Sequence, residues 1–195
     1  MESFNQIIFV IASSLLIPVI IILTFLFIKS LLSLGVFYGN YADRMKFKKN
    51  IKPLLKQMED AQVDLPKDLN QRHILSKHLQ EMVAVNWHPV KGEKVLSDME
   101  LAFKKQLEKP KLIMRAGPML GLMGTLIPMG PALAGLASGD IANMAINMQL
   151  AFATTVIGIF IGLVGFIVLE IQKRWAAEDF SELEYLYNLK SDTDA

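Results

Sequence analysis

The stretch PMLGLMGTLIPMGPALAGLASG, residues 118–139, is apolar enough to lie in a lipid bilayer, although it is rich in glycine and proline. It belongs to an apolar run over residues 112–136 that is interrupted only by Arg115. Small or cyclic residues recur along it at alternating steps of four and three, which places them on one helical face. This face consists of Gly117, Gly121, Gly124, Pro128, Pro131 and Gly135. Since lipid provides no hydrophobic force between helices, the face predicts the close approach of another helix.

Two further apolar runs, residues 7–28 and 146–169, contain no charged residue. At about 1.5 Å of rise per helical residue, each of the three runs can cross a hydrocarbon core of roughly 30 Å. The sequence therefore predicts an all-α membrane protein with three transmembrane helices. A cleaved signal peptide is the alternative for the first run, but that run is too long and only the acidic Glu2 precedes it.

Charge predicts the topology in the membrane. Of the 20 Lys and Arg residues, 16 lie between Arg44 and Arg115, and basic loops stay in the cytoplasm. We therefore expect a protein of the prokaryotic cytoplasmic membrane with its N-terminus outside and its C-terminus inside. The expected parts are helix one (1–37), a helical cytoplasmic domain (38–111), helix two (112–137), a short extracytoplasmic turn (138–145), helix three (146–170) and a cytoplasmic helix and tail (171–195).

The expected cytoplasmic domain has two stretches with a helical period. One apolar face contains Leu69, Leu75, Leu79, Met82 and Val83, and the other contains Val95, Met99, Ala102, Phe103 and Leu107. The proline-containing segments VDLPKD and NWHPVKG end the helices that precede them. After helix three, Phe180, Leu183 and Tyr187 form a stripe that can pack on this domain.

Several functions are disfavoured by the residues present. The chain has no cysteine, which excludes disulfides and thiolate sites. The basic loop is also rich in acidic residues, and this mixed surface argues against nucleic-acid binding. We expect His73, His78 and His88 to be exposed surface residues rather than metal ligands, because their spacing does not place them together. No nucleophile and base occur at a recognisable spacing, so an enzyme is the least favoured class and no cofactor is expected.

Helix three carries a second face of small residues. Its members are Ala151, Thr155, Gly158, Gly162 and Gly165. One interpretation is that the two small faces pack helices two and three against each other. Two complete faces exceed what one helix pair needs, however, and the surplus suggests self-association around an axis.

Three hydroxyl groups, those of Thr125, Thr154 and Thr155, lie inside the second and third apolar runs. Each can donate to a carbonyl of its own helix, which is a purely structural role. Alternatively, hydroxyls can hydrate an ion passage without the roughly 2.5–3.5 kcal/mol cost of a central charged residue. None of the runs contains Asp or Glu. If ions pass here, the acidic group that binds them must come from a partner.

The segments AGPMLGLMGTLIPMG and NMQLAFATTVIGIFIG resemble the MotA/TolQ/ExbB proton channel family. The residues that match its patterns are Gly121, Leu122, Gly124 and Thr125 in helix two, and Ala151, Phe152, Thr155, Ile157, Gly158 and Ile159 in helix three. Three helices with a loop between the first two are similar to the TolQ and ExbB branch. One position departs from that branch, because Leu150 stands where its members commonly have Glu.

The resemblance implies a homo-oligomeric ring, expected to be a pentamer, around two copies of a single-helix partner similar to ExbD, TolR or MotB. That partner carries an Asp in the membrane, and Thr125, Thr155 and the neighbouring Thr154 are the ion-pathway residues beside it. The expected pore-lining or helix-packing residues are Gly117, Gly121, Gly124, Pro128, Ala151, Gly158 and Gly162.

The function that the resemblance implies is the coupling of a transmembrane ion gradient to mechanical work. Protons are the expected ion, with sodium as the alternative because paired threonines are similar to those of some sodium-driven members. A passive membrane scaffold without ion conduction is the alternative function.

Overall fold

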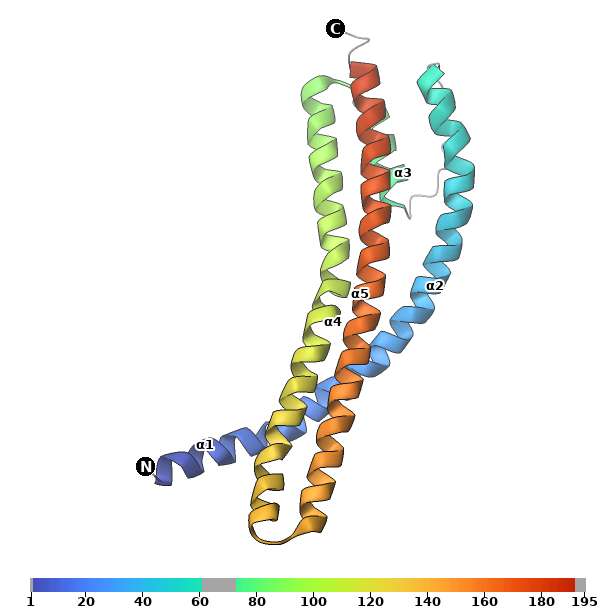
Figure 1. Cartoon of the computed structure of the whole chain (residues 1–195). Coiled ribbons are helices and arrows are strands. Elements are labelled where there is room, and N and C mark those ends of the chain that lie inside the picture. Colours follow the sequence, from blue (N-terminus) through green and yellow to red (C-terminus); the bar gives the residue numbers. More distant parts are fainter. Residues whose placement is uncertain (1, 61–72, 192–195) are drawn as a thin grey trace. The chain divides into compact units, whose positions relative to one another are not determined.

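The computed structural model describes residues 2–60 and 73–191, and these residues form helices without any strand (Figure 1). The helices are α1 (Glu2–Ser14), α2 (Leu16–Asp60), α3 (Ile74–Ala84), α4 (Pro89–Ala137) and α5 (Ile141–Ser191). Three helical segments in the described residues are long and apolar enough to cross a membrane. The all-helical class and the three apolar helices are therefore confirmed. Leu69 and the segment VDLPKD lie outside the described residues.

The first apolar run is divided between two helices at Leu15. Pro18 lacks a backbone N–H and its ring crowds the carbonyl of Ser14, four residues earlier, which explains a break at this point. The Ser14 hydroxyl donates to the carbonyl of Val10 at 2.8 Å, a bond that also favours bending. The sequence predicted one uninterrupted helix through this run, so the break is a difference from that expectation.

The described residues separate into two compact units. We call the unit drawn from Met1–Phe37 and Pro110–Val168 the apolar unit. The unit drawn from Tyr38–Lys109 and Leu169–Ala195 is called the charged unit, because the apolar unit contains only five charged residues. Those five are Glu2, Lys29, Lys111, Arg115 and Asp140.

α4 continues as a helix through four prolines, Pro110, Pro118, Pro128 and Pro131. Each proline removes one hydrogen bond to the carbonyl four residues earlier, so α4 has fewer internal hydrogen bonds than its length permits. Such losses are tolerated in membrane helices when neighbouring groups satisfy the freed carbonyls. We expected helix two to begin at residue 112, whereas α4 begins at Pro89, where a proline is well suited to the first helical position.

The connection between α4 and α5 is shorter than expected. Gly139 adopts a left-handed φ of 76°, its N–H donates to Leu136, and the N–H of Asp140 donates to Gly135 at 2.8 Å. This pair of bonds is a Schellman ending for α4. The Asp140 carboxylate then accepts from the backbone N–H of Asn143 at 3.0 Å, which caps the start of α5. Residues 141–145, which we assigned to the turn, are therefore helical.

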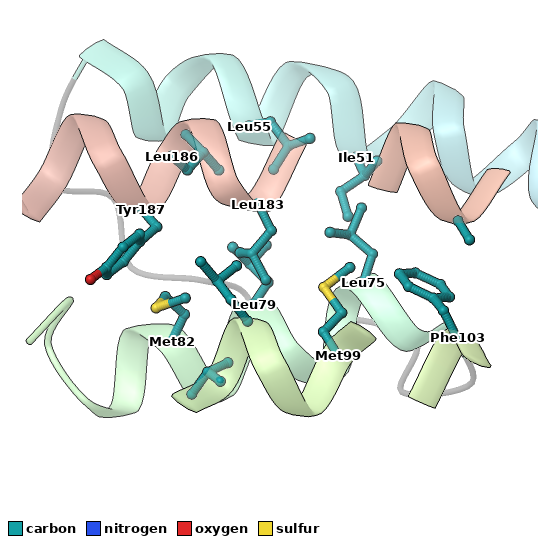
Figure 2. Packing of buried hydrophobic residues seen from close by; sticks show 13 residues of the cluster. Ile51, Leu55, Leu75, Leu79, Met82, Met99, Phe103, Leu183, Leu186 and Tyr187 are labelled. Carbon is teal, nitrogen blue, oxygen red and sulfur yellow. The ribbon is translucent and has the colours of Figure 1, made fainter. Parts of the chain in front are cut away.

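The charged unit has its own hydrophobic core, formed by the end of α2, α3, the start of α4 and the end of α5. Figure 2 shows Leu183 pointing from α5 into this cluster, where it is fully buried with Leu79, Met82 and Met99. Tyr187 is also part of the core, and its hydroxyl donates to the carbonyl of Pro89 at 2.7 Å. The stripe after helix three thus packs on the loop helices, as its spacing predicts.

A buried ion pair joins α2 to α5 in the charged unit. Both terminal nitrogens of Arg44 donate to the Asp179 carboxylate, at 2.5 and 2.6 Å. The guanidinium also lies 5.5 Å from the centre of the Trp175 ring, and that ring lies 5.8 Å from the ring of Tyr41. Burial raises the pKa of the Asp179 carboxyl, while the hydrogen bonds from Arg44 act in the opposite direction. No local sequence pattern reveals this pair, because its members are 135 residues apart.

The expectation that the histidines are exposed was wrong for His78. This side chain is buried, with Nδ1 2.8 Å from the carbonyl oxygen of Ile74. His73 is half-buried and stacks on Phe47 with ring centres 4.0 Å apart. His88 is exposed. Spacing could not reveal this burial, because a histidine whose ring nitrogen has a carbonyl partner can be buried at little cost.

Candidate functional site in the helix hairpin

α4 and α5 form a hairpin (Figure 1). Glycine faces glycine between the two helices. A Cβ built on Gly158 would lie 2.7 Å from the carbonyl oxygen of Gly117 and 2.7 Å from the Cα of Gly121. A Cβ on Gly162 would lie 2.6 Å from the ring of Pro118. Real Cβ atoms do not approach other atoms so closely, so each of these positions requires glycine for its small size. We call this contact the glycine seam.

The seam uses the small faces that the sequence predicted. Within it the structure buries Gly117, Gly121, Gly124, Pro128, Ala151, Gly158 and Gly162. The small faces of α4 and α5 therefore pack against each other. This packing accounts for both faces, so their number does not by itself indicate self-association. A ring remains a prediction from the family resemblance.

The three threonines differ in their surroundings. Thr154 is 3% exposed and fills the space beside Gly124. A Cβ built on Gly124 would lie 2.6 Å from the Cβ of Thr154. Its hydroxyl lies 2.9 Å from the Ala151 carbonyl and 3.2 Å from that of Leu150. Thr125 and Thr155 are only partly buried. Thr154 thus lies in the seam, whereas the other two lie at its margin.

The hydroxyls of Thr125 and Thr155 each have a carbonyl acceptor in their own helix. Thr125 donates to Leu122 at 2.7 Å, and Thr155 donates to Ala151 at 3.2 Å. These are the structural bonds expected of threonine in a membrane helix. Each hydroxyl oxygen keeps lone pairs that can accept a further hydrogen bond or contact a cation.

Thr125 and Thr155 lie on the same side of the hairpin. Each directly follows a seam residue, Gly124 or Thr154, and one residue forward corresponds to a turn of about 100° around a helix. Because α4 and α5 are antiparallel, this turn moves both threonines toward the same side. Their levels along the hairpin are also close, because Gly124, which precedes Thr125, packs directly on Thr154, which precedes Thr155.

The side of the hairpin that carries these two threonines, which we call the threonine side, is not covered by other described residues. Its large apolar side chains, Leu122, Met129, Phe152 and Ile159, are 42–64% exposed. The first two helices contact the hairpin elsewhere. The ring of Phe9 approaches Gly130, and the rings of Phe27 and Phe160 lie 5.7 Å apart. An exposed apolar surface of this kind contacts lipid or another protein.

No charged residue interrupts this surface between Pro118 and Met129 on α4 or between Phe152 and Phe166 on α5. Nor do the described residues contain a group of three His, Cys, Asp or Glu that could hold a metal ion. What the threonine side offers chemically is therefore a pair of neutral hydroxyls at neighbouring levels, within apolar surroundings.

Residues 67–184, more than half of the chain, match the MotA/TolQ/ExbB proton channel family. The chain belongs to this family. Its three apolar helices are consistent with the TolQ and ExbB branch. Comparisons with curated proteins and with solved structures returned no match.

Membership in the family has consequences at a general level. The family consists of channel and energy-transducing proteins rather than enzymes. Its members generally oligomerise and work with a single-helix partner. Together with the three apolar helices, membership indicates a multi-pass protein of the inner membrane.

Proposed function

We propose that this chain is the ion-conducting subunit of a complex that couples a transmembrane proton gradient to mechanical work. In this proposal the subunit forms a ring, a pentamer by analogy with the family, around two copies of a partner with one membrane helix. The N-terminus lies outside the membrane, and the charged unit lies in the cytoplasm. The gradient supplies about 2.3 kcal/mol per charge for each 100 mV.

The observation that carries the proposal is the position of Thr125 and Thr155 on the same side of the hairpin, at neighbouring levels. A helix that lies along this side meets both hydroxyls without meeting any fixed charge. The glycine seam supports this arrangement, because α4 and α5 hold each other at close range and leave the threonine side free for a partner. We assign the ion pathway to these two hydroxyls and assign Thr154 to packing in the seam.

The partner must supply the acidic group. The only acidic residues of the apolar unit are Glu2, near the chain start, and Asp140, in the α4–α5 turn. Asp140 caps α5, and its pKa is lowered by hydrogen bonds from Asn143, so it holds its proton weakly. Leu150, where the TolQ and ExbB branch commonly has Glu, cannot bind a proton. An Asp on the partner helix beside the two threonines completes the site.

Ion flux through the complex with its partner tests the proposal. We would reconstitute the complex in liposomes and measure proton uptake under an imposed potential. Thr155→Val keeps the side-chain shape and removes the hydroxyl, so flux should fall about tenfold or more, since losing one hydrogen-bond partner costs about 1–3 kcal/mol. Thr24→Val is the matched control, because Thr24 makes the same type of bond, to Ile20 at 2.8 Å, on exposed α2.

The outcomes separate the candidate functions. Native mass measurement should show a ring for wild type and for both variants, with flux lost only in Thr155→Val. Unchanged flux in Thr155→Val, or an equal loss in Thr24→Val, would remove the threonine side from the pathway. An assembled complex without any flux would favour the passive scaffold. Flux that follows a sodium gradient at constant pH would replace protons by sodium.

A further inference from the structure

The charged unit contains a small polar cavity that the proposed function does not use. Its volume is about 230 Å³, and four helices line it. The polar lining consists of Asn40, Asp43 and Arg44 from α2, His73 at the start of α3, Gln106 from α4, and Gln172 and Asp179 from α5. Trp175, Ala176, Ile74 and Phe103 supply its apolar walls.

Two buried polar atoms of this lining have no hydrogen-bonding partner among the described residues. They are the Nε of Arg44 and the Oε1 of Gln172. Arg44 is 8% exposed, and its two terminal nitrogens are already occupied by Asp179. An unsatisfied buried donor or acceptor costs about 1–3 kcal/mol, so two in one cavity call for an occupant that satisfies both.

The chemistry of the occupant follows from the two atoms. Arg44 Nε–H requires an acceptor, whereas Gln172 Oε1 requires a donor. An anion can accept but not donate, and Asp43 and Asp179 repel it. A cation cannot accept the hydrogen bond that Arg44 Nε–H requires. A neutral molecule that both donates and accepts satisfies both atoms, and a volume of about 230 Å³ accommodates several water molecules at roughly 30 Å³ each.

We propose that this cavity is a water-binding site in which ordered water bridges Arg44 Nε–H and Gln172 Oε1 and hydrates the ion pair between Arg44 and Asp179. The same water reaches His73, which also lines the cavity. Water here lets the buried ion pair join α2 to α5 without leaving polar groups unpaired. This proposal is independent of ion conduction by the apolar unit.

His73 gives the site a measurable response to pH. The charged groups that face it are Asp43 and Arg44 from α2 and Asp179 from α5, while α4 contributes only the uncharged Phe103 and Gln106. Burial and Arg44 lower the pKa of His73, and the two carboxylates act in the opposite direction. Water in the cavity would solvate the charged imidazole, so its removal should lower this pKa further.

Gln172→Met tests the proposal in the full-length protein in lipid nanodiscs. Methionine has a similar length but offers no strong acceptor, so it should expel the bridging water. Gln172→Glu keeps an acceptor at the same position and should retain the water. Gln106→Met is the control for a general effect of methionine, because Gln106 lines the same cavity but is exposed.

Two measurements decide the result. Radiolytic labelling with oxygen-18 water should detect slowly exchanging water beside Trp175 and Phe103 in wild type, Gln172→Glu and Gln106→Met. In Gln172→Met this slow labelling should disappear, and the pKa of His73, followed by NMR, should fall by about one unit, the usual scale of an environmental shift.

Three findings would overturn the proposal. The first is labelling beside Trp175 at the rate of bulk solvent in wild type. The second is slow labelling and a pKa of His73 that are the same in wild type and Gln172→Met. The third is a high-resolution density map in which Gln172 turns to accept directly from Arg44 Nε, with no water between them.

Discussion

Replacement of Gly158 by alanine tests whether the glycine seam holds the hairpin together. The added Cβ would lie 2.7 Å from two backbone atoms, the Cα of Gly121 and the carbonyl oxygen of Gly117. Backbone atoms cannot rotate away as a side chain can. Carbon atoms prefer separations of about 3.5–4.0 Å, so α4 and α5 must separate locally by about 0.8–1.3 Å.

This separation determines the expected loss of stability. A gap of about 0.5–1 Å forfeits a quarter to a half of the dispersion energy of each affected contact. Forced overpacking of a close contact costs about 1–3 kcal/mol. Alanine also favours a helix over glycine by up to about 1 kcal/mol, which offsets part of that cost. Gly35→Ala isolates the second effect, because a Cβ at Gly35 meets nothing within 4 Å.

Equilibrium unfolding in mixed detergent micelles, followed by circular dichroism, measures both variants. Gly35→Ala should be as stable as wild type or slightly more stable, and Gly158→Ala should be less stable than Gly35→Ala by about 1–3 kcal/mol. Adding Gly117→Ala to Gly158→Ala should cost less than the sum of the two single changes, because one separation relieves both clashes. If Gly158→Ala unfolds like Gly35→Ala, the seam is not a close backbone contact and the reasoning fails.

Two further predictions concern the charged unit. Burial and Arg44 lower the pKa of His73 in the folded state, so its contribution to stability is present above pH 6.5 and is lost as the pH falls through the folded pKa. His73→Phe preserves the stacking on Phe47 and should make the free energy of unfolding depend less on pH between 7.5 and 5. An unchanged pH dependence would exclude His73 as its source. Arg44→Met leaves the Asp179 carboxylate buried without its partner, which should cost about 3–5 kcal/mol at pH 7.5. Because the pKa of Asp179 then rises further, this loss should shrink toward pH 4.5 as the carboxyl takes up its proton. A loss that is the same at both pH values would contradict the account.

Much of the membrane part could be predicted from the sequence, because its signals are local. Apolar runs of sufficient length indicate membrane helices whatever surrounds them. The steps of three and four between Gly117, Gly121 and Gly124 reveal a helical face by geometry alone. The residue pattern around Thr125 and Thr155 is sufficient by itself to indicate the family, and the match over residues 67–184 confirms it.

Other features depend on which segments meet, and no local pattern contains that information. The sequence could not show that the small faces of α4 and α5 pack against each other, since an identical face could equally pack on a second copy of this chain. It grouped Thr154 with Thr155, whereas the structure buries the first beside Gly124 and leaves the second at the seam margin. Neighbouring residues on a helix point in directions about 100° apart, so two adjacent threonines can have different surroundings although they are the same residue type.

The amino-acid sequence by itself determined the helical membrane class, the small-residue faces and the absence of an acidic residue within the apolar runs, because each follows from residue type and spacing along one helix. Only the tertiary structure decided that glycine meets glycine between α4 and α5, that Arg44 pairs with Asp179 across 135 positions, and that Thr125 and Thr155 lie on one side. These are relations between helices, and they depend on how closely two backbones approach and on which faces turn toward each other.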